Sequence, residues 1–116
     1  MANHIALELD RAKIAEMSCI AGVGGGVAPL VQLAQSGRPV VAIDGCQLAC
    51  ARQCLVNQGV QPTQHVLLNM LGVRKRLHAD FDRDHAARLL DELSVQVAGL
   101  NPRQEHDANP DLQQAT

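Results

Sequence analysis

The sequence has almost no aromatic residues: Phe81 is the single one in 116 residues, with no tryptophan or tyrosine. Proteins that bind single-stranded nucleic acids use aromatic rings as stacking platforms for the bases. Basic residues are also few, since Arg74, Lys75 and Arg76 form the one basic cluster and the formal net charge is -2. Three basic residues are too few to follow a phosphate backbone. A nucleic-acid partner is therefore disfavoured.

Long apolar runs are missing as well. No stretch approaches the roughly 20 apolar residues that span a bilayer, and the first four residues lack the basic-then-apolar pattern of a secretory signal. We therefore expect a cytoplasmic protein with no membrane partner. With 47% hydrophobic and 19% charged residues, the composition is that of an ordinary globular domain, and a chain of this length can bury a core without disulfides.

Paired C-x-x-C motifs of the zinc-ribbon kind are absent, although the chain has four cysteines: Cys19, Cys46, Cys50 and Cys54. In a reducing cytoplasm these side chains should be thiols rather than disulfides. Serine-histidine arrangements typical of nucleophilic catalysis are absent too. Metal binding or thiol chemistry is therefore the first kind of function to consider, and an enzyme is neither indicated nor excluded.

The apolar pattern predicts alternating helices and strands in a single domain at residues 1–100. Helices are expected at 2–11, 27–35, 46–57 and 82–97, the last capped by Asp80 or Asp82. Buried strands are expected at 16–21, 39–43 and 65–69. This order predicts an α/β fold of three layers, in which helices flank a parallel sheet as in flavodoxin-like and Rossmann-like proteins. Residues 101–116 have little apolar surface and are expected to form a disordered polar tail.

Three cysteines are expected at the carboxyl edge of this sheet, where open α/β proteins hold their ligands. Cys19 lies near the end of the first expected strand, and Cys46 and Cys50 follow the second, four residues apart on one helix face. Three thiolates at one edge can hold a tetrahedral zinc ion. Cys54 lies too far along the helix to join them, because eight residues of helix span about 12 Å. The alternative for each cysteine is a small buried apolar side chain, and this is our expectation for Cys54.

A glycine-rich segment offers a second hypothesis. Gly22–Gly26 is expected to form a tight loop between a strand and a helix, where its N–H groups could face an anion. With Asp44 twenty positions after Gly24, the segment imitates a dinucleotide fingerprint, although Val27 stands where that fingerprint has glycine or alanine. Cys46 is expected at a helix start, which favours a reactive thiolate. A thiol redox or nucleotide-binding enzyme is therefore the alternative function, and a permissive tight loop is the simpler interpretation of the glycines.

Two motifs resemble the DGC-domain family, which is named for its Asp-Gly-Cys. They are Met17-Ser18-Cys19-Ile20-Ala21-Gly22-Val23-Gly24 and Ile43-Asp44-Gly45-Cys46-Gln47-Leu48-Ala49-Cys50-Ala51, and the similarity continues through Leu71-Gly72-Val73-Arg74-Lys75. The resemblance covers roughly residues 2–90. It implies an α/β fold and a zinc site formed by cysteines, carried here onto Cys19, Cys46 and Cys50. Cys54 stands where the family pattern has no ligand, and the resemblance implies no defined biochemical role.

The resemblance also implies a missing segment. Members of this family begin with a strand that ends in a Cys-Ser-Gly type of turn, whereas Met1 here lies within the helix that follows that turn. We therefore expect a truncated chain without the first strand and its cysteine. The fourth zinc position would be filled by water, by His78 or by a group from another chain. The strand edges left bare predict self-association or marginal stability.

Overall fold

The computed structural model describes residues 1–100, and the tail expected at 101–116 lies outside the described residues. In chain order the elements are α1 (Ala2–Arg11), α2 (Ile20–Gly24), α3 (Ala28–Ala34), β1 (Val41–Asp44), α4 (Cys50–Asn57), β2 (Gln64–Leu67), the 3-10 turn η1 (Leu68–Leu71) and α5 (Arg83–Leu100). Within residues 1–100, no helix is both long and apolar enough to cross a membrane.

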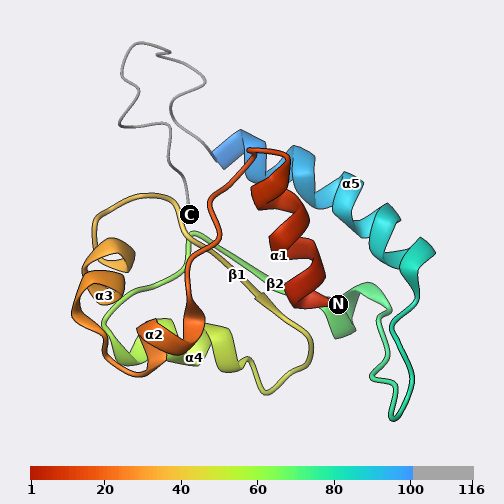
Figure 1. Ribbon diagram of the computed structural model, residues 1–116, viewed down its shortest axis with the longest axis horizontal. Helices are drawn as coiled ribbons and strands as arrows, with labels where there is room; N and C mark the ends of the chain where they lie inside the picture. Colours follow the sequence, from red (N-terminus) through yellow and green to blue (C-terminus); the bar gives the residue numbers. More distant parts are fainter. Residues whose placement is uncertain (101–116) are drawn as a thin grey trace.

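A parallel pair of strands lies at the centre of the fold. Val41 of β1 is opposite Gln64 of β2, and Asp44 is opposite Leu67. Helix α4 lies in the connection between the two strands, as parallel pairing requires a crossover. Figure 1 shows α1 and α5 on one side of the strands and α2, α3 and α4 on the other. The expected parallel sheet with flanking helices is confirmed at this level.

Each side of the sheet has its own apolar core. On one side, buried residues of α1, β2 and α5 pack together, and Val41 and Ile43 of β1 rest on them. On the other side, Ala42 of β1 packs with Val23 of α2 and Leu55 of α4. Successive side chains of a strand point to opposite faces, so β1 contributes to both cores. The short strand is therefore apolar on both faces, which is typical of parallel sheets covered by helices.

The strand expected at 16–21 is wrong. Residues 16–19 have no regular structure, and Ile20 begins the short helix α2. The reason is that this run has only one β-branched residue, Ile20, and a short apolar run does not by itself distinguish a strand from a buried helix. The sheet consequently has two strands among the described residues rather than three.

The start of α5 agrees with the sequence. The Asp82 carboxylate accepts hydrogen bonds from the backbone N–H groups of Asp84 and His85, at 3.0 and 3.1 Å. Asp82 is therefore the N-cap, while Asp80 instead accepts a hydrogen bond from the Arg83 side chain at 3.0 Å. The hydrogen bond from the His85 N–H is the largest cause that lowers the pKa of Asp82 below its ordinary value.

This lowered pKa predicts a pH-dependent contribution of the Asp82 cap to stability. A carboxyl whose pKa is lower in the folded state stabilises the fold above the unfolded pKa of about 4, and the contribution is lost as the pH falls through the folded pKa. Asparagine also caps helices but does not titrate. We expect the stability advantage of the wild type over Asp82→Asn to shrink as urea unfolding is measured from pH 6 down to pH 3. A difference that stays constant over this range would contradict the assignment.

Candidate functional site

The carboxyl end of β1 is fixed by a buried carboxylate. Asp44 is 6% exposed, and its oxygens accept hydrogen bonds from the backbone N–H groups of Ala51, at 2.7 Å, and Arg52, at 3.2 Å. The Nε2 atom of His65 in β2 lies 2.8 Å from the same carboxylate. Because an ionised carboxylate only accepts, the imidazole N–H donates in this pair. One side chain thus joins β1, β2 and α4.

The Asp44 side chain caps α4 in place of the residue at the N-cap position. The residue at the N-cap position is Ala49, which has no side-chain acceptor and adopts a left-handed φ of 52°. The second and third N–H groups of a helix are the ones that a capping side chain normally satisfies, and here they are those of Ala51 and Arg52. The negative charge of Asp44 also complements the positive end of the helix dipole. The carboxylate therefore determines where α4 begins and how it meets the sheet.

This start differs from the sequence-based expectation. Helix α4 begins at Cys50, four residues later than expected, and residues 46–49 form a turn in which the Ala49 N–H donates to the Cys46 carbonyl oxygen at 3.1 Å. The expectation that Cys46 occupies a helix start is therefore wrong, and so is the shared helix face of Cys46 and Cys50. The sequence does not reveal this turn, because it depends on hydrogen bonds that the Asp44 carboxylate accepts from N–H groups seven and eight residues further along the chain.

Cys46 and Cys50 nevertheless line the same pocket. The cavity measures about 390 Å³ and lies beyond the end of β1, with Asp44 in its wall. Both thiols are free, Cys46 half-buried and Cys50 exposed. The pocket thus holds two sulfur atoms at the edge of the sheet where α/β proteins bind their ligands. We call it the thiol pocket.

Another part of the lining of the thiol pocket comes from the segment that precedes α5. It carries the basic side chains of Arg74, Lys75 and Arg76, together with Asp80 and Phe81. The pKa of Asp80 is lowered from its ordinary value, mainly by the hydrogen bond from the Arg83 side chain and then by the one from the Phe81 N–H. Arg76 lies 3.9 Å from the Asp82 carboxylate, so Arg74 and Lys75 are the basic side chains of this segment with no carboxylate partner among the described ion pairs. Their positive charge suits a pocket for thiolates or another anion.

The other predicted ligands lie elsewhere. Cys19 is exposed and occupies the N-cap position of α2, and neither it nor His78 lines the thiol pocket. Among residues 1–100, no group of three histidine, cysteine, aspartate or glutamate side chains is arranged to hold a metal ion. The structure thus brings together Cys46 and Cys50 but not Cys19. The zinc ligands stay a prediction.

The glycine-rich segment is not the expected loop. Gly22 and Gly24 lie within α2, and no strand precedes them among the described residues. A β-carbon at Gly22 would overlap the Leu30 side chain, and one at Gly24 would lie 2.8 Å from the Cys54 sulfur. These glycines allow α2 to pack closely on α3 and α4. Cys54 is half-buried in this contact, and the Asp44 carboxylate, which a dinucleotide site would need for a ribose, is held by protein groups.

The pairing of Asp44 with His65 was not foreseen from the sequence. The two residues are 21 positions apart, and the sequence pattern indicates only that His65 begins a strand. The sequence offers one signal for this contact: a polar residue ends one buried strand, and a histidine lies near the start of the next. Their contact depends on the parallel register of β1 and β2, in which His65 is opposite Ala42, two residues from Asp44.

Comparison with known proteins gives a consistent result. A family model described as the DGC domain matches residues 1–93. The chain is also similar to a Pseudomonas aeruginosa protein named Anaerobic and virulence modulator AnvM, with 53% identity over 93 residues, covering 80% of this chain and 71% of the relative. No solved structure matches the sequence.

Removing the Asp44 carboxylate should lower the free energy of unfolding of the protein. Asp44→Ala leaves the N–H groups of Ala51 and Arg52 and the imidazole of His65 without their acceptor, so we expect a loss of about 2–3 kcal/mol in the free energy of unfolding. Asp91→Ala removes an exposed carboxylate of α5 and should change it by less than about 0.5 kcal/mol. Urea unfolding of both variants provides the measurement. Equal effects of the two substitutions would refute the role of Asp44.

The contact between α2 and α4 can be tested separately. Gly24→Ala forces the Cys54 sulfur to move, and overpacking of this kind costs about 1–3 kcal/mol. Adding Cys54→Ala removes the sulfur that the new β-carbon would meet. The loss in free energy of unfolding of the double variant should therefore be smaller than the sum of the two single losses by at least about 1 kcal/mol. Gly99→Ala, at a helical glycine with open space around it, serves as the control. Additive effects of Gly24→Ala and Cys54→Ala would show that the two residues do not meet.

Proposed function

Because this chain belongs to the DGC-domain family, we propose that it binds a zinc ion through the thiolates of Cys19, Cys46 and Cys50. The observation that supports this most is that Cys46 and Cys50 line one pocket at the carboxyl end of β1. We also propose a three-layer, flavodoxin-like arrangement for the fold. Its support is the parallel pairing of β1 with β2 and the apolar packing on both sides of the strands.

The thiol pocket suits zinc in donor type and in charge. Thiolates are preferred zinc ligands, and a zinc ion held by three thiolates carries a net negative charge. Arg74, Lys75 and Arg76, which line the same pocket, would offset that charge. The fourth position is left for water, His78 or a group from another chain. Three protein ligands and one open position are how catalytic zinc is held, and the bound metal would supply a Lewis acid there.

Zinc binding would require Cys19 to approach the other two thiols. Its helix, α2, packs beside α4 through Gly24 and Cys54, and Ile20 and Ala51, which follow Cys19 and Cys50, line a common cavity. The starts of α2 and α4 therefore lie near each other. The side chain of Cys19 makes no capping hydrogen bond to α2, so it is free to turn. We expect metal binding and this local rearrangement to be coupled, as in other proteins whose ligands are not pre-arranged.

A thiol redox role is the second candidate function, and the shared pocket of Cys46 and Cys50 favours it equally. The two roles differ in what protects the thiols. A reactive thiolate in the metal-free protein is alkylated by iodoacetamide at pH 6, whereas bound zinc protects it. A nucleotide-binding role has less support, because Gly22 and Gly24 lie in a helix. The relative is named as a modulator, which favours a regulatory role for this chain over a metabolic one.

Zinc content measured on single cysteine variants tests the proposal. We expect the untagged wild type to hold about one zinc per chain, and Cys46→Ser and Cys50→Ser to lose at least about tenfold in affinity, because each removes a ligand. Cys19→Ser should show the same loss. Cys54→Ser is the matched control and should bind zinc normally.

Undiminished zinc in Cys46→Ser and Cys50→Ser would overturn the metal assignment. Rapid alkylation of Cys46 that zinc does not slow would favour the redox role instead. The free energy of unfolding of each cysteine variant is measured in parallel. A variant that loses zinc but keeps its stability has lost a ligand and not the fold.

A further inference from the structure

The thiol pocket carries positive charge that has no partner among residues 1–100. Its lining includes two carboxylates and three basic side chains. The Asp44 carboxylate is engaged by His65 and by two backbone N–H groups, and the Asp80 carboxylate by the Arg83 side chain at 3.0 Å. Both carboxylates therefore have partners other than the basic side chains of the lining.

Arg74 and Lys75 are the two cations left without a partner. Arg76 is held within its own segment, by the Asp82 carboxylate at 3.9 Å and by the Asp80 carbonyl oxygen at 3.2 Å. The side chains of Arg74 and Lys75 make no hydrogen bond or ion pair within the part of the chain that the structure describes. Like charges on neighbouring residues repel each other, so their place in one pocket favours an occupant of opposite charge.

The thiolates do not use up this charge. A zinc ion held by three thiolates, as proposed above, leaves one net negative charge, whereas Arg74 and Lys75 together carry two positive charges. Positive charge therefore remains in the pocket even when zinc is bound. A further negative group is needed to balance it.

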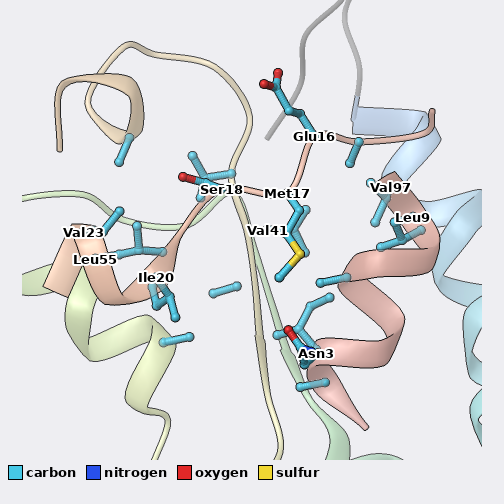
Figure 2. Close-up of a pocket in the computed structure, with 18 of the residues that line it drawn as sticks. Asn3, Leu9, Glu16, Met17, Ser18, Ile20, Val23, Val41, Leu55 and Val97 are labelled. Atoms are coloured by element: carbon cyan, nitrogen blue, oxygen red, sulfur yellow. The ribbon is translucent and has the colours of Figure 1, made fainter. Parts of the chain in front are cut away.

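A second cavity of the described residues differs in charge. Figure 2 shows it between α1 on one side and α2 with α4 on the other, with Leu9, Met17 and Val23 in its lining. It measures about 330 Å³, and Glu16 is the single ionisable residue of its lining. Because a carboxylate repels anions, the thiol pocket is the one of these two cavities that suits a negatively charged ligand.

The thiol pocket has the place and the size of a small-molecule site. It lies at the edge where open α/β sheets bind their ligands, and its volume of about 390 Å³ falls within the range of roughly 300–1,000 Å³ that is typical of ligand pockets. Apolar parts of its lining come from Leu68, Val73 and Phe81. A ligand with one charged group and a small organic remainder matches this lining.

We propose that the thiol pocket binds a small phosphate monoester, with its phosphate group held by Arg74 and Lys75 and its organic part against Val73 and Phe81. A phosphate monoester carries about 1.5 to 2 negative charges at pH 7, which matches two cations better than the single charge of a carboxylate does. A guanidinium donates two parallel hydrogen bonds to phosphate oxygens, and an ammonium adds a compact charge. The site needs neither zinc nor oxidation of the thiols, so it extends the proposed function without depending on it.

Phenyl phosphate is the probe that tests this site, because it joins a phosphate group to a small apolar ring. Binding to the full chain is measured by isothermal titration calorimetry. We expect one saturable site, several-fold weaker binding of benzoate, which has the ring but a single charge, and no binding of phenol. In ¹⁵N–¹H spectra the amide signals of Cys46, Cys50 and Lys75 should shift as the site fills, because all three residues line the pocket.

Matched variants locate the phosphate group. Arg74→Gln and Lys75→Gln should each weaken phenyl phosphate at least about tenfold, because each removes a charged hydrogen-bond donor. Both side chains are exposed, so the fold and the zinc content should be kept. Arg88→Gln removes an exposed cation of α5 that does not line the pocket and should leave the affinity unchanged.

Three results would overturn the proposal. The first is the absence of saturable binding at millimolar phenyl phosphate. The second is an equal loss of affinity in Arg88→Gln, which identifies a general effect of charge. The third is full affinity in Arg74→Gln and Lys75→Gln together with loss of binding in Cys46→Ser, which assigns the anion to a bound metal. Phenyl phosphate that still binds to a wild-type chain without zinc supports this site and contradicts the zinc proposal alone.

Discussion

The carboxylate of Asp44 is the constraint on which the edge of this sheet depends. Asp44 is the last residue of β1. Its carboxylate accepts hydrogen bonds from the second and third N–H groups of α4 and pairs with His65 of β2. Without it, α4 would begin on an alanine that has no capping atom. The turn that carries Cys46 and the helix start that carries Cys50 are both set by this one group. The aspartate of the Asp-Gly-Cys sequence therefore has a structural role, and the chemical role that we propose falls to Cys46.

Two cavities formed by residues 1–100 border β1 at different places. The thiol pocket is beyond its carboxyl end and combines two cysteine side chains with three basic ones. The second cavity, of about 330 Å³, is lined by Val40 to Ile43 and is almost entirely apolar. Both border one short strand that is covered on its two faces and, within the part of the chain that the structure describes, pairs with one other strand. Helix α4 contributes to both cavities: Cys50 lines the thiol pocket, while Ala51 and Leu55 line the apolar one.

The sequence predicted the elements that have strong local signals. The periodic apolar residues of α1 and α5, the proline near the start of α3 and the β-branched run of β1 each placed an element within a few residues. The sequence does not predict helix α2, because the close packing of Gly22 and Gly24 against Leu30 and Cys54 is a tertiary effect. For the site, the place of Cys46 and Cys50 at the end of β1 was predictable. The turn between them was not, since it depends on hydrogen bonds from Asp44 to residues beyond it.

Native-state hydrogen exchange at two amides tests the role of Asp44 most directly. The first N–H groups of a helix ordinarily have no intrahelical acceptor and exchange quickly. The account predicts that the amides of Ala51 and Arg52 exchange as slowly as that of Leu55 in the interior of α4, because the Asp44 carboxylate accepts from both. Exchange of Ala51 and Arg52 at the rate of freely exposed amides, with Leu55 still protected, would contradict it.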